Sequence, residues 1–232
     1  MTLPTWLIWL SIASLFVALV SAAYILYDLI ARKRQMMAVM KWVWPITALY
    51  MGPVAVWAYR TMGLAGSPHG GGQEQKGGSE DGSGQPYWQI VFKGVTHCGG
   101  GCTLGDLIGE WGIFISAATL AVIAIWPEYI ADYLLTYALG IAFQYFAIAP
   151  MRGLDVKDGI IAAVKADTLS LTAFEIGLFG WMALYDFVFF AHHLHPDSPV
   201  YWFMMQIGMV VGFATSFPMN WWLIKRGLKE KM

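Results

Sequence analysis

Both cysteines of the chain lie in one segment, residues 96–110, which reads THCGGGCTLGDLIGE. They follow the spacing CxxxC, and His97 stands directly before Cys98. Thiolate and imidazole groups are preferred ligands of Cu(I) and zinc. Two Cys and one His would complete a low-coordinate Cu(I) site, whereas a closed tetrahedral zinc site needs one further ligand. The segment therefore predicts a soft-metal site with His97, Cys98 and Cys102 as ligands.

The residues around the two cysteines predict a turn followed by a helix. Three consecutive glycines, residues 99–101, allow a tight turn. Thr103 is then the expected N-cap, with Asp106 in the first turn, where an acid suits the positive end of a helix. Positions one turn apart on this helix share a side, so Asp106 and Glu110 lie on the same side as Cys102. Both carboxylates therefore join the candidate metal ligands.

The same segment supports two other interpretations. The thiols could cycle between dithiol and disulfide forms and exchange electrons with a membrane carrier. Alternatively, Gly101, Gly105 and Gly109 form a GxxxGxxxG row, which lets helices approach closely in lipid. The cysteines would then be small packing residues or form a structural disulfide. Metal binding, redox chemistry and packing all stay open at this point.

A second group of candidate residues lies in the apolar runs nearer the C-terminus. Glu175 and Asp186 interrupt the run Thr168–Ala191, and a carboxylate in hydrocarbon usually faces a partner, water or a substrate path. On a helix they share a face about 16 Å apart, which suits a proton or cation relay, or pairing with another helix. Thioethers one turn apart are typical of Cu(I) paths. The candidate relay or permeation residues are Glu175, Asp186, His193, Met205 and Met209.

The composition shows what kind of structure must position these residues. The chain has 232 residues, of which 58% are hydrophobic and 12% are charged, against about 25% charged in a soluble domain. The net charge is −1, which provides no basic field for nucleic acid. These values exclude a soluble globular enzyme, a disordered protein and a nucleic-acid partner. The lipid bilayer is the expected partner.

Long apolar runs predict an all-α, polytopic membrane bundle of about six transmembrane helices. A spanning helix needs about 20 mostly apolar residues. A further piece, Tyr87–Val95, is expected to be short and interfacial or re-entrant. The six runs are Met1–Tyr27, Trp42–Tyr59, Thr103–Pro127, Tyr133–Met151, Thr168–Ala191 and Ser198–Ile224.

A Gly-rich stretch divides the chain into parts. Residues 63–86 contain nine Gly and almost nothing apolar, which is typical of a flexible linker. It separates a two-helix N-terminal membrane section, residues 1–62, from a four-helix module, residues 87–232. Six crossings place four basic residues of loop 32–41 on one side and ten others on the opposite side. The larger group favours a cytoplasmic C-terminus in the cell membrane, and a seventh crossing at 87–95 would place both groups together.

Several blocks of the second part resemble one family. These blocks are HCGGGCTLGDLIGEW, FQYFAIAPMRGL, KADTLSLTAFEIGLFGWM, HPDSPVYWFMMQIGM and FPMNWWLIKRGLKEKM. From about Lys93 to Met232 the chain resembles an uncharacterised family of prokaryotic polytopic membrane proteins, catalogued as a domain of unknown function. The resemblance implies an integral membrane location and no agreed activity, so it supplies no catalytic residues. The first two helices and the linker look like a variable attachment.

From the sequence we favour a non-enzymatic membrane protein that binds and transports or buffers a soft metal, Cu(I) or zinc. Its entry ligands would be His97, Cys98 and Cys102. The alternatives are a thiol–disulfide oxidoreductase that uses the two cysteines, and an assembly subunit without catalysis. A homo-oligomer or a membrane partner is compatible with all three.

Overall fold

The structure is a computed structural model that describes residues 3–32, 38–64, 85–120, 125–190 and 194–229. Within these ranges every regular element is helical and there is no strand, which confirms the expected all-α fold. Two of the elements, η1 and η2, are short π-helical turns that extend α3 and α6. The elements are α1 (Thr5–Ala31), α2 (Met40–Met51), α3 (Pro53–Ala58), η1 (Tyr59–Gly63), α4 (Tyr87–Leu120), α5 (Ile125–Arg152), α6 (Val156–Leu184), η2 (Tyr185–Phe190) and α7 (Pro199–Lys225).

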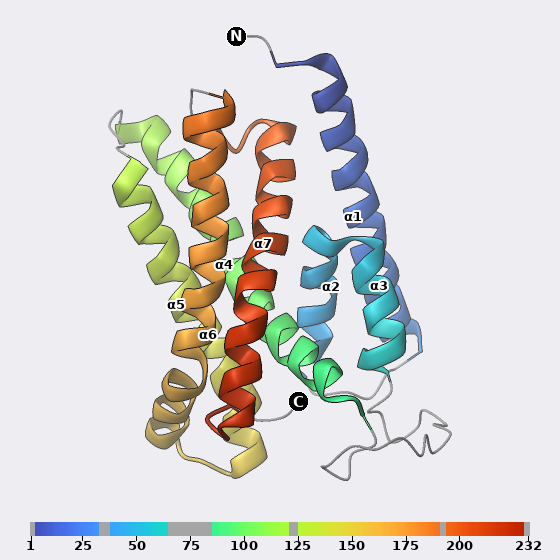
Figure 1. Cartoon of the computed structure of the whole chain (residues 1–232), viewed down its shortest axis with the longest axis vertical. Coiled ribbons are helices and arrows are strands. Elements are labelled where there is room, and N and C mark those ends of the chain that lie inside the picture. Colours follow the sequence, from blue (N-terminus) through green and yellow to red (C-terminus); the bar gives the residue numbers. More distant parts are fainter. Residues whose placement is uncertain (1–2, 33–37, 65–84, 121–124, 191–193, 230–232) are drawn as a thin grey trace.

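The long helices lie side by side in one bundle (Figure 1). Helices α4, α5, α6 and α7 alternate in direction and pack against their chain neighbours, and α1 packs against α7. Helix α1 begins at one end of the bundle, and α7 terminates at the opposite end (Figure 1). We call the end at which α7 terminates the C-terminal end and the other the N-terminal end.

Four helical segments in the described ranges are long and apolar enough to cross a membrane: Thr5–Ala31, Asp132–Pro150, Val156–Phe189 and Pro199–Lys225. Helix α4 is longer than most of them, with 34 residues, and also runs between the two ends (Figure 1). Its polar and charged residues make α4 less apolar than these four segments, so it is not counted among them. The structure therefore does not confirm the predicted number of about six spans.

The expected second span, Trp42–Tyr59, is instead a helical hairpin, so that prediction is wrong. Helix α2 ends at Gly52, which adopts a positive φ of 54°, and Pro53 starts α3 in the reverse direction. A left-handed residue followed by Pro ends a helix because Gly tolerates the conformation and Pro cannot continue the hydrogen-bond ladder. Both ends of the hairpin point to the C-terminal end of the bundle, and its tip lies partway along it (Figure 1).

Helix α4 is continuous from Tyr87 to Leu120, so the tight turn expected at residues 99–101 is wrong, and so is an N-cap at Thr103. The Thr103 hydroxyl instead donates to the Gly99 carbonyl oxygen inside the helix, at 2.7 Å. The glycines serve close packing. A Cβ on Gly101 would lie 2.8 Å from the Cα of Gly140 in α5, which is too close for any side chain. The GxxxG row therefore brings α4 and α5 together.

The tip of the hairpin is fixed to α7 by a polar side chain. The Gln206 amide nitrogen donates to the Leu49 carbonyl oxygen at 2.7 Å, and its amide oxygen accepts from the Ser14 hydroxyl at 2.8 Å. One residue of α7 therefore ties together α1 and the last turn of α2, whose carbonyl groups lack helical partners. Residues 65–84 of the expected linker lie outside the described residues.

Candidate functional site

The two thiols lie side by side in the interior of the bundle. Cys98 and Cys102 occupy the same face of α4, one turn apart, and are 1% and 0% exposed. The Cys102 thiol lies against the Cys98 sulfur, and both cysteines are free. Continuation of α4 through the glycines produces this arrangement, because i and i+4 positions of a helix are neighbours.

A carboxylate from α6 faces the thiols. Glu175 is 2% exposed and contacts the Cys102 thiol. Apart from that thiol, neither of its oxygens has a hydrogen-bond partner among the described residues. A charged, unpaired carboxylate in such an interior costs several kcal/mol. Glu175 therefore needs either a proton or a cation, and the described residues supply no cation beside it.

Towards the C-terminal end, a hydrogen-bonded cluster continues from the thiols. The Ser170 hydroxyl donates to the Cys98 sulfur at 3.2 Å and accepts from the Asn220 amide at 2.6 Å. The Lys229 ammonium donates to the same hydroxyl at 3.3 Å and to the Asp167 carboxylate at 2.5 Å. Burial alone would lower the pKa of Lys229, and neighbouring negative groups, led by Asp167, raise it above its usual value. The ammonium is therefore charged.

Towards the N-terminal end, the next polar residues are acids of α4. Asp106 is 1% exposed, accepts from the Thr136 hydroxyl at 2.8 Å and lies within electrostatic range of Glu175 and Glu110. No Lys or Arg of the described ranges is buried beside Asp106 or Glu175. We call the whole connected set the interior polar path: Lys229, Asp167, Ser170, Cys98, Cys102, Glu175, Asp106 and Glu110.

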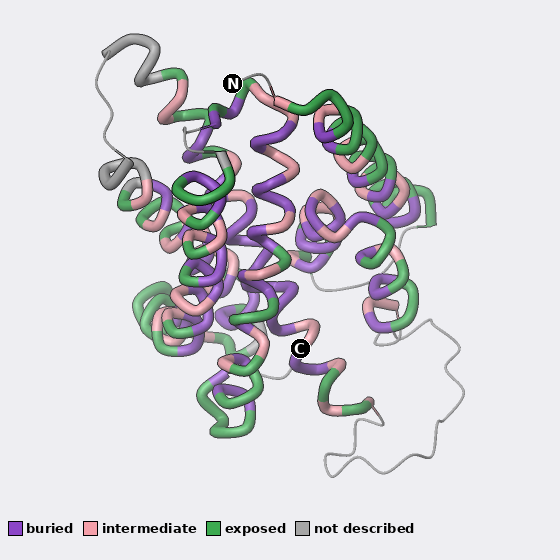
Figure 2. Tube along the Cα trace, turned by 45° about the horizontal axis from the view of Figure 1, so that its top comes forward, coloured by how far each residue is buried: buried purple, intermediate pink, exposed green. Residues whose placement is uncertain are grey.

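Burial along the chain shows that the polar path lies in the centre of the bundle. In Figure 2 the buried segments form its middle and the exposed ones its outer surface, notably along α1. Large apolar side chains such as Phe16 and Trp9 on α1 are both 67% exposed, as suits contact with lipid. The bundle thus has an apolar outer surface and encloses a set of buried polar groups within its apolar interior, as suits a protein in lipid.

Tyr50 of the hairpin also reaches the thiol pair. It sits two residues before Gly52, at the tip, and is 5% exposed. Its hydroxyl would lie 3.0 Å from a Cβ on Gly99, and it is in electrostatic range of both thiols. The part of the chain expected to be a variable attachment therefore contributes a side chain to the candidate site.

The other predicted ligands are not brought to the thiols. His97 is fully buried, but as the neighbour of Cys98 on a continuous helix it points towards α5, near the Phe143 carbonyl and the Gln144 side chain. Asp186 is buried in η2, about 16 Å along the helix from Glu175. Among the described residues, no three His, Cys, Asp or Glu side chains are placed to hold a metal ion.

The remaining predicted residues are packed or undescribed. Met205 and Met209 are buried on α7, in the same apolar cluster as the two cysteines. His193 lies outside the described residues. Sequence reasoning did not assign roles to Ser170, Lys229 or Tyr50. Lys229 lies in a run of charged residues that looks like a solvated tail, and only the fold reveals its burial.

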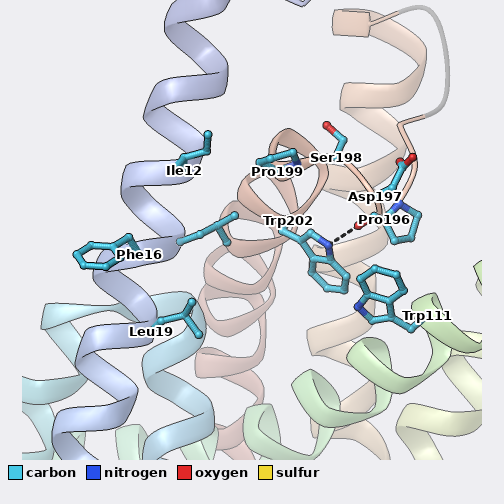
Figure 3. Close-up of a pocket in the computed structure, with 10 residues that line it drawn as sticks. Ile12, Phe16, Leu19, Trp111, Pro196, Asp197, Ser198, Pro199 and Trp202 are labelled. Atoms are coloured by element: carbon cyan, nitrogen blue, oxygen red, sulfur yellow. Dashed lines mark hydrogen bonds between the residues drawn. The ribbon is translucent and has the colours of Figure 1, made fainter.

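A surface groove elsewhere holds none of these groups. It has a volume of about 420 Å³ and lies between α1 and the start of α7. In Figure 3 the rings of Trp111 and Trp202 lie next to each other at its edge, 6.0 Å apart, and the Trp202 indole donates to the Pro196 carbonyl at 2.7 Å. Its lining is nearly all apolar, so it suits lipid contact rather than chemistry.

Comparison with known proteins gives one family. Residues 87–229 match the family described as Domain of unknown function (DUF4396). No curated protein and no solved structure matches the chain. The matched range begins with α4 and ends at Lys229, so it contains every residue of the interior polar path and excludes Tyr50.

Proposed function

The chain belongs to the DUF4396 family, a domain of unknown function, and we propose that it binds Cu(I) at the Cys98–Cys102 pair and carries it across a membrane. The observation that carries this proposal is the adjacent, free thiol pair buried beside Glu175, a carboxylate with no cationic partner among the described residues. Soft sulfur ligands select soft cations. A buried anionic group without a protein partner is a place where a cation gains stability.

The geometry favours Cu(I) over zinc. Zinc in proteins is held by four ligands, or by three and a water. Among the described residues no three His, Cys, Asp or Glu side chains are arranged to hold one ion together, so the two sulfurs are the ligands in this proposal, and low coordination by sulfur suits Cu(I). Protons on the thiols and on Glu175 keep the interior neutral when no metal is bound, and the metal replaces protons when it binds.

His97 has a different role in this proposal from the one expected from the sequence. Because it points to α5, it is not a ligand, and the two thiols alone hold the ion. Met205 and Met209 provide thioether sulfur in the same apolar cluster, which suits transient contacts with a departing ion. The proposal thus separates a binding pair from a release route.

The test is an anaerobic Cu(I) titration of the purified full chain against a chromogenic chelator. Wild-type protein is expected to bind one Cu(I), and Cys98→Ser and Cys102→Ser are each expected to weaken binding at least about 100-fold, as loss of a metal ligand or its support commonly does. His97→Gln is the matched control and should bind like the wild type. Copper X-ray absorption should then show two sulfur neighbours.

Transport is measured with the same variants in proteoliposomes. Cu(I) uptake is expected in wild type and His97→Gln and absent in either Ser variant. Equal copper binding by the wild type and the Cys98→Ser/Cys102→Ser double variant would overturn the proposal. So would loss of binding in His97→Gln at unchanged thermal stability, because the ligand set would then be the one expected from the sequence.

A second candidate function follows from the same adjacency of sulfurs. Two free thiols one turn apart can lose two electrons and two protons to a membrane quinone and form a disulfide. One measurement distinguishes this thiol–disulfide oxidoreductase from the copper carrier. Thiol counting after anaerobic incubation with a soluble quinone analogue should find two thiols for the carrier and none for the oxidoreductase.

We also propose that the C-terminal end of the bundle faces the cytoplasm. The helix ends nearest to the described Lys and Arg residues lie on that side (Figure 1). The residues stand within the three helical turns next to those ends or in the adjoining segments: Arg32, Lys41, Arg60, Lys93, Arg152, Lys157, Lys165, Lys225, Arg226 and Lys229. Cytoplasmic loops carry an excess of such residues. The re-entrant hairpin and the crossing of α4 bring together the two basic groups that six crossings would separate. Fusions of green fluorescent protein to the C-terminus should fluoresce, and fusions to the N-terminus should not.

A further inference from the structure

The segment after α7 turns inward at the C-terminal end of the bundle. Gly227 adopts a positive φ of 69°, and the backbone N–H groups of Leu228 and Lys229 both donate to the Leu223 carbonyl oxygen, at 3.0 and 3.3 Å. This is the hydrogen-bonded helix ending that a left-handed Gly permits. The turn directs Lys229 inward, where it is 2% exposed, while Lys225 remains exposed.

Lys229 stands between this end of the bundle and the thiol pair. Its ammonium contacts Asp167 at 2.5 Å and the Ser170 hydroxyl at 3.3 Å, and that hydroxyl donates to the Cys98 sulfur at 3.2 Å. One side chain therefore separates the lysine from the candidate copper site. Both members of the Lys229–Asp167 pair have fully buried side chains.

The atoms around the ammonium are those of a cation site. The second oxygen of Asp167 has no hydrogen-bond partner among the described residues, and neither does the amide oxygen of Asn220. The hydroxyls of Ser170 and Ser216 lie 3.4 Å apart next to them. Oxygen atoms of this kind bind monovalent and hard cations, and the ammonium of Lys229 fills that place in the structure.

We propose that Lys229 is a tethered cation that closes the cytoplasmic mouth of the interior polar path, bound at an oxygen-lined cation site of Asp167 and Ser170. Displacement of its ammonium by another cation opens the way to Cys98. The identity of the ion that passes through this mouth rests on the proposed copper function. Closure of the mouth by Lys229 does not depend on that function. A buried ion pair adds little stability compared with apolar residues of the same size. The position of the Lys229–Asp167 pair at one end of the interior polar path is therefore better explained by gating than by stability.

The experiment uses the native thiols as reporters in membrane vesicles of both orientations. A permanently charged methanethiosulfonate reagent, which does not cross lipid, is applied to the wild type and to Lys229→Ala, and the rate of thiol modification is measured. Lys229→Ala is expected to react at least about tenfold faster, from the C-terminal side only, because removal of one partner of a buried pair opens and hydrates the site. Lys225→Ala, the same change at an exposed neighbour, should react like the wild type.

A double variant separates gating from misfolding. Asp167→Asn/Lys229→Ala removes both charges and leaves no buried charge unpaired, so it should fold and still react faster than wild type from one side. Faster reaction from both sides in the double variant would indicate a disrupted bundle and overturn the proposal. An unchanged rate in the double variant would also overturn it. If the modification rate rises on one side while copper binding is absent, closure by Lys229 is supported and the copper function is overturned. If copper binds while the modification rate is unchanged, the copper function is supported and closure by Lys229 is overturned.

Discussion

The two halves of the interior polar path differ in how their charges are balanced. At the C-terminal end, Asp167 has a lysine partner, and Ser170 and Asn220 complete a hydrogen-bonded cluster. In the middle, Glu175 and Asp106 are equally buried but have no Lys or Arg beside them in the described ranges. The first half is neutral by itself, and the second becomes neutral only with protons or a bound cation. This contrast supports the proposed carrier of cations, which requires a closed mouth and a centre that exchanges protons for the ion.

The strongest test of this contrast is Asp167→Asn. It leaves the Lys229 ammonium buried without its counter-charge, which should lower the free energy of unfolding by about 3–5 kcal/mol. Chemical unfolding of the purified protein in detergent, followed by tryptophan fluorescence, measures the loss. Asp167→Asn/Lys229→Met should recover most of it. If the double variant is no more stable than Asp167→Asn, the Asp167 carboxylate is not the counter-charge that stabilises the buried Lys229 ammonium.

Gly105→Val tests whether the centre depends on close contact between helices rather than on ion pairing. A Cβ at Gly105 would collide with the backbone of Thr136 in α5, so the helices must separate, at a cost of about 1–3 kcal/mol. The same unfolding experiment measures it. Gly112→Ala is the control, since a Cβ there meets nothing within 4 Å, and it should leave stability equal or raised by up to about 1 kcal/mol.

Thr136→Val removes the hydroxyl that donates to Asp106. The expected loss of unfolding free energy is about 1 kcal/mol, the value for a hydrogen bond between neutral groups, because no Lys or Arg of the described ranges lies beside Asp106 to balance a charge. Hydrogen bonds to charged groups are worth about 1.5–3 kcal/mol. A loss in that higher range, measured by unfolding at neutral pH, would mean that Asp106 is ionised and that the centre holds a charge.

Sequence patterns predicted the last helix closely, and the helix before it and the site in part. The run 198–224 corresponds to α7, and the run 168–191 covers the second part of α6 and η2, while α6 begins twelve residues earlier, at Val156. Continuous apolar residues leave few alternatives in a membrane. Residue types that are rare in apolar segments indicated the Cys98–Cys102 pair as a metal site and Glu175 as a separate relay residue, but not the contact between Glu175 and Cys102. Each of these inferences needed only local information.

The errors have a common physical cause, which is tertiary packing. Three glycines predict a turn when only local propensity is weighed, but in α4 they allow α5 to approach, and the packing outweighs their low helix propensity. Lys229 lies 62 residues from Asp167, and nothing in a run of basic residues marks the one that folds inward. The reversal at Gly52 likewise involves a distant contact, because the Gln206 side chain of α7 binds the Leu49 carbonyl oxygen at the hairpin tip.

The smallest expected effect is the most informative about the centre of the path. Glu175→Gln keeps the size of the side chain and mimics the protonated carboxyl, so stability should change by no more than about 0.5 kcal/mol, in contrast to the large loss from Asp167→Asn. The two variants make the same chemical change on one helix, eight residues apart, and are compared by unfolding in parallel. A loss at Glu175 as large as that at Asp167 would require a fixed positive partner for Glu175. A near-zero loss combined with lost copper uptake would show that Glu175 serves transport, because the fold does not need its charge.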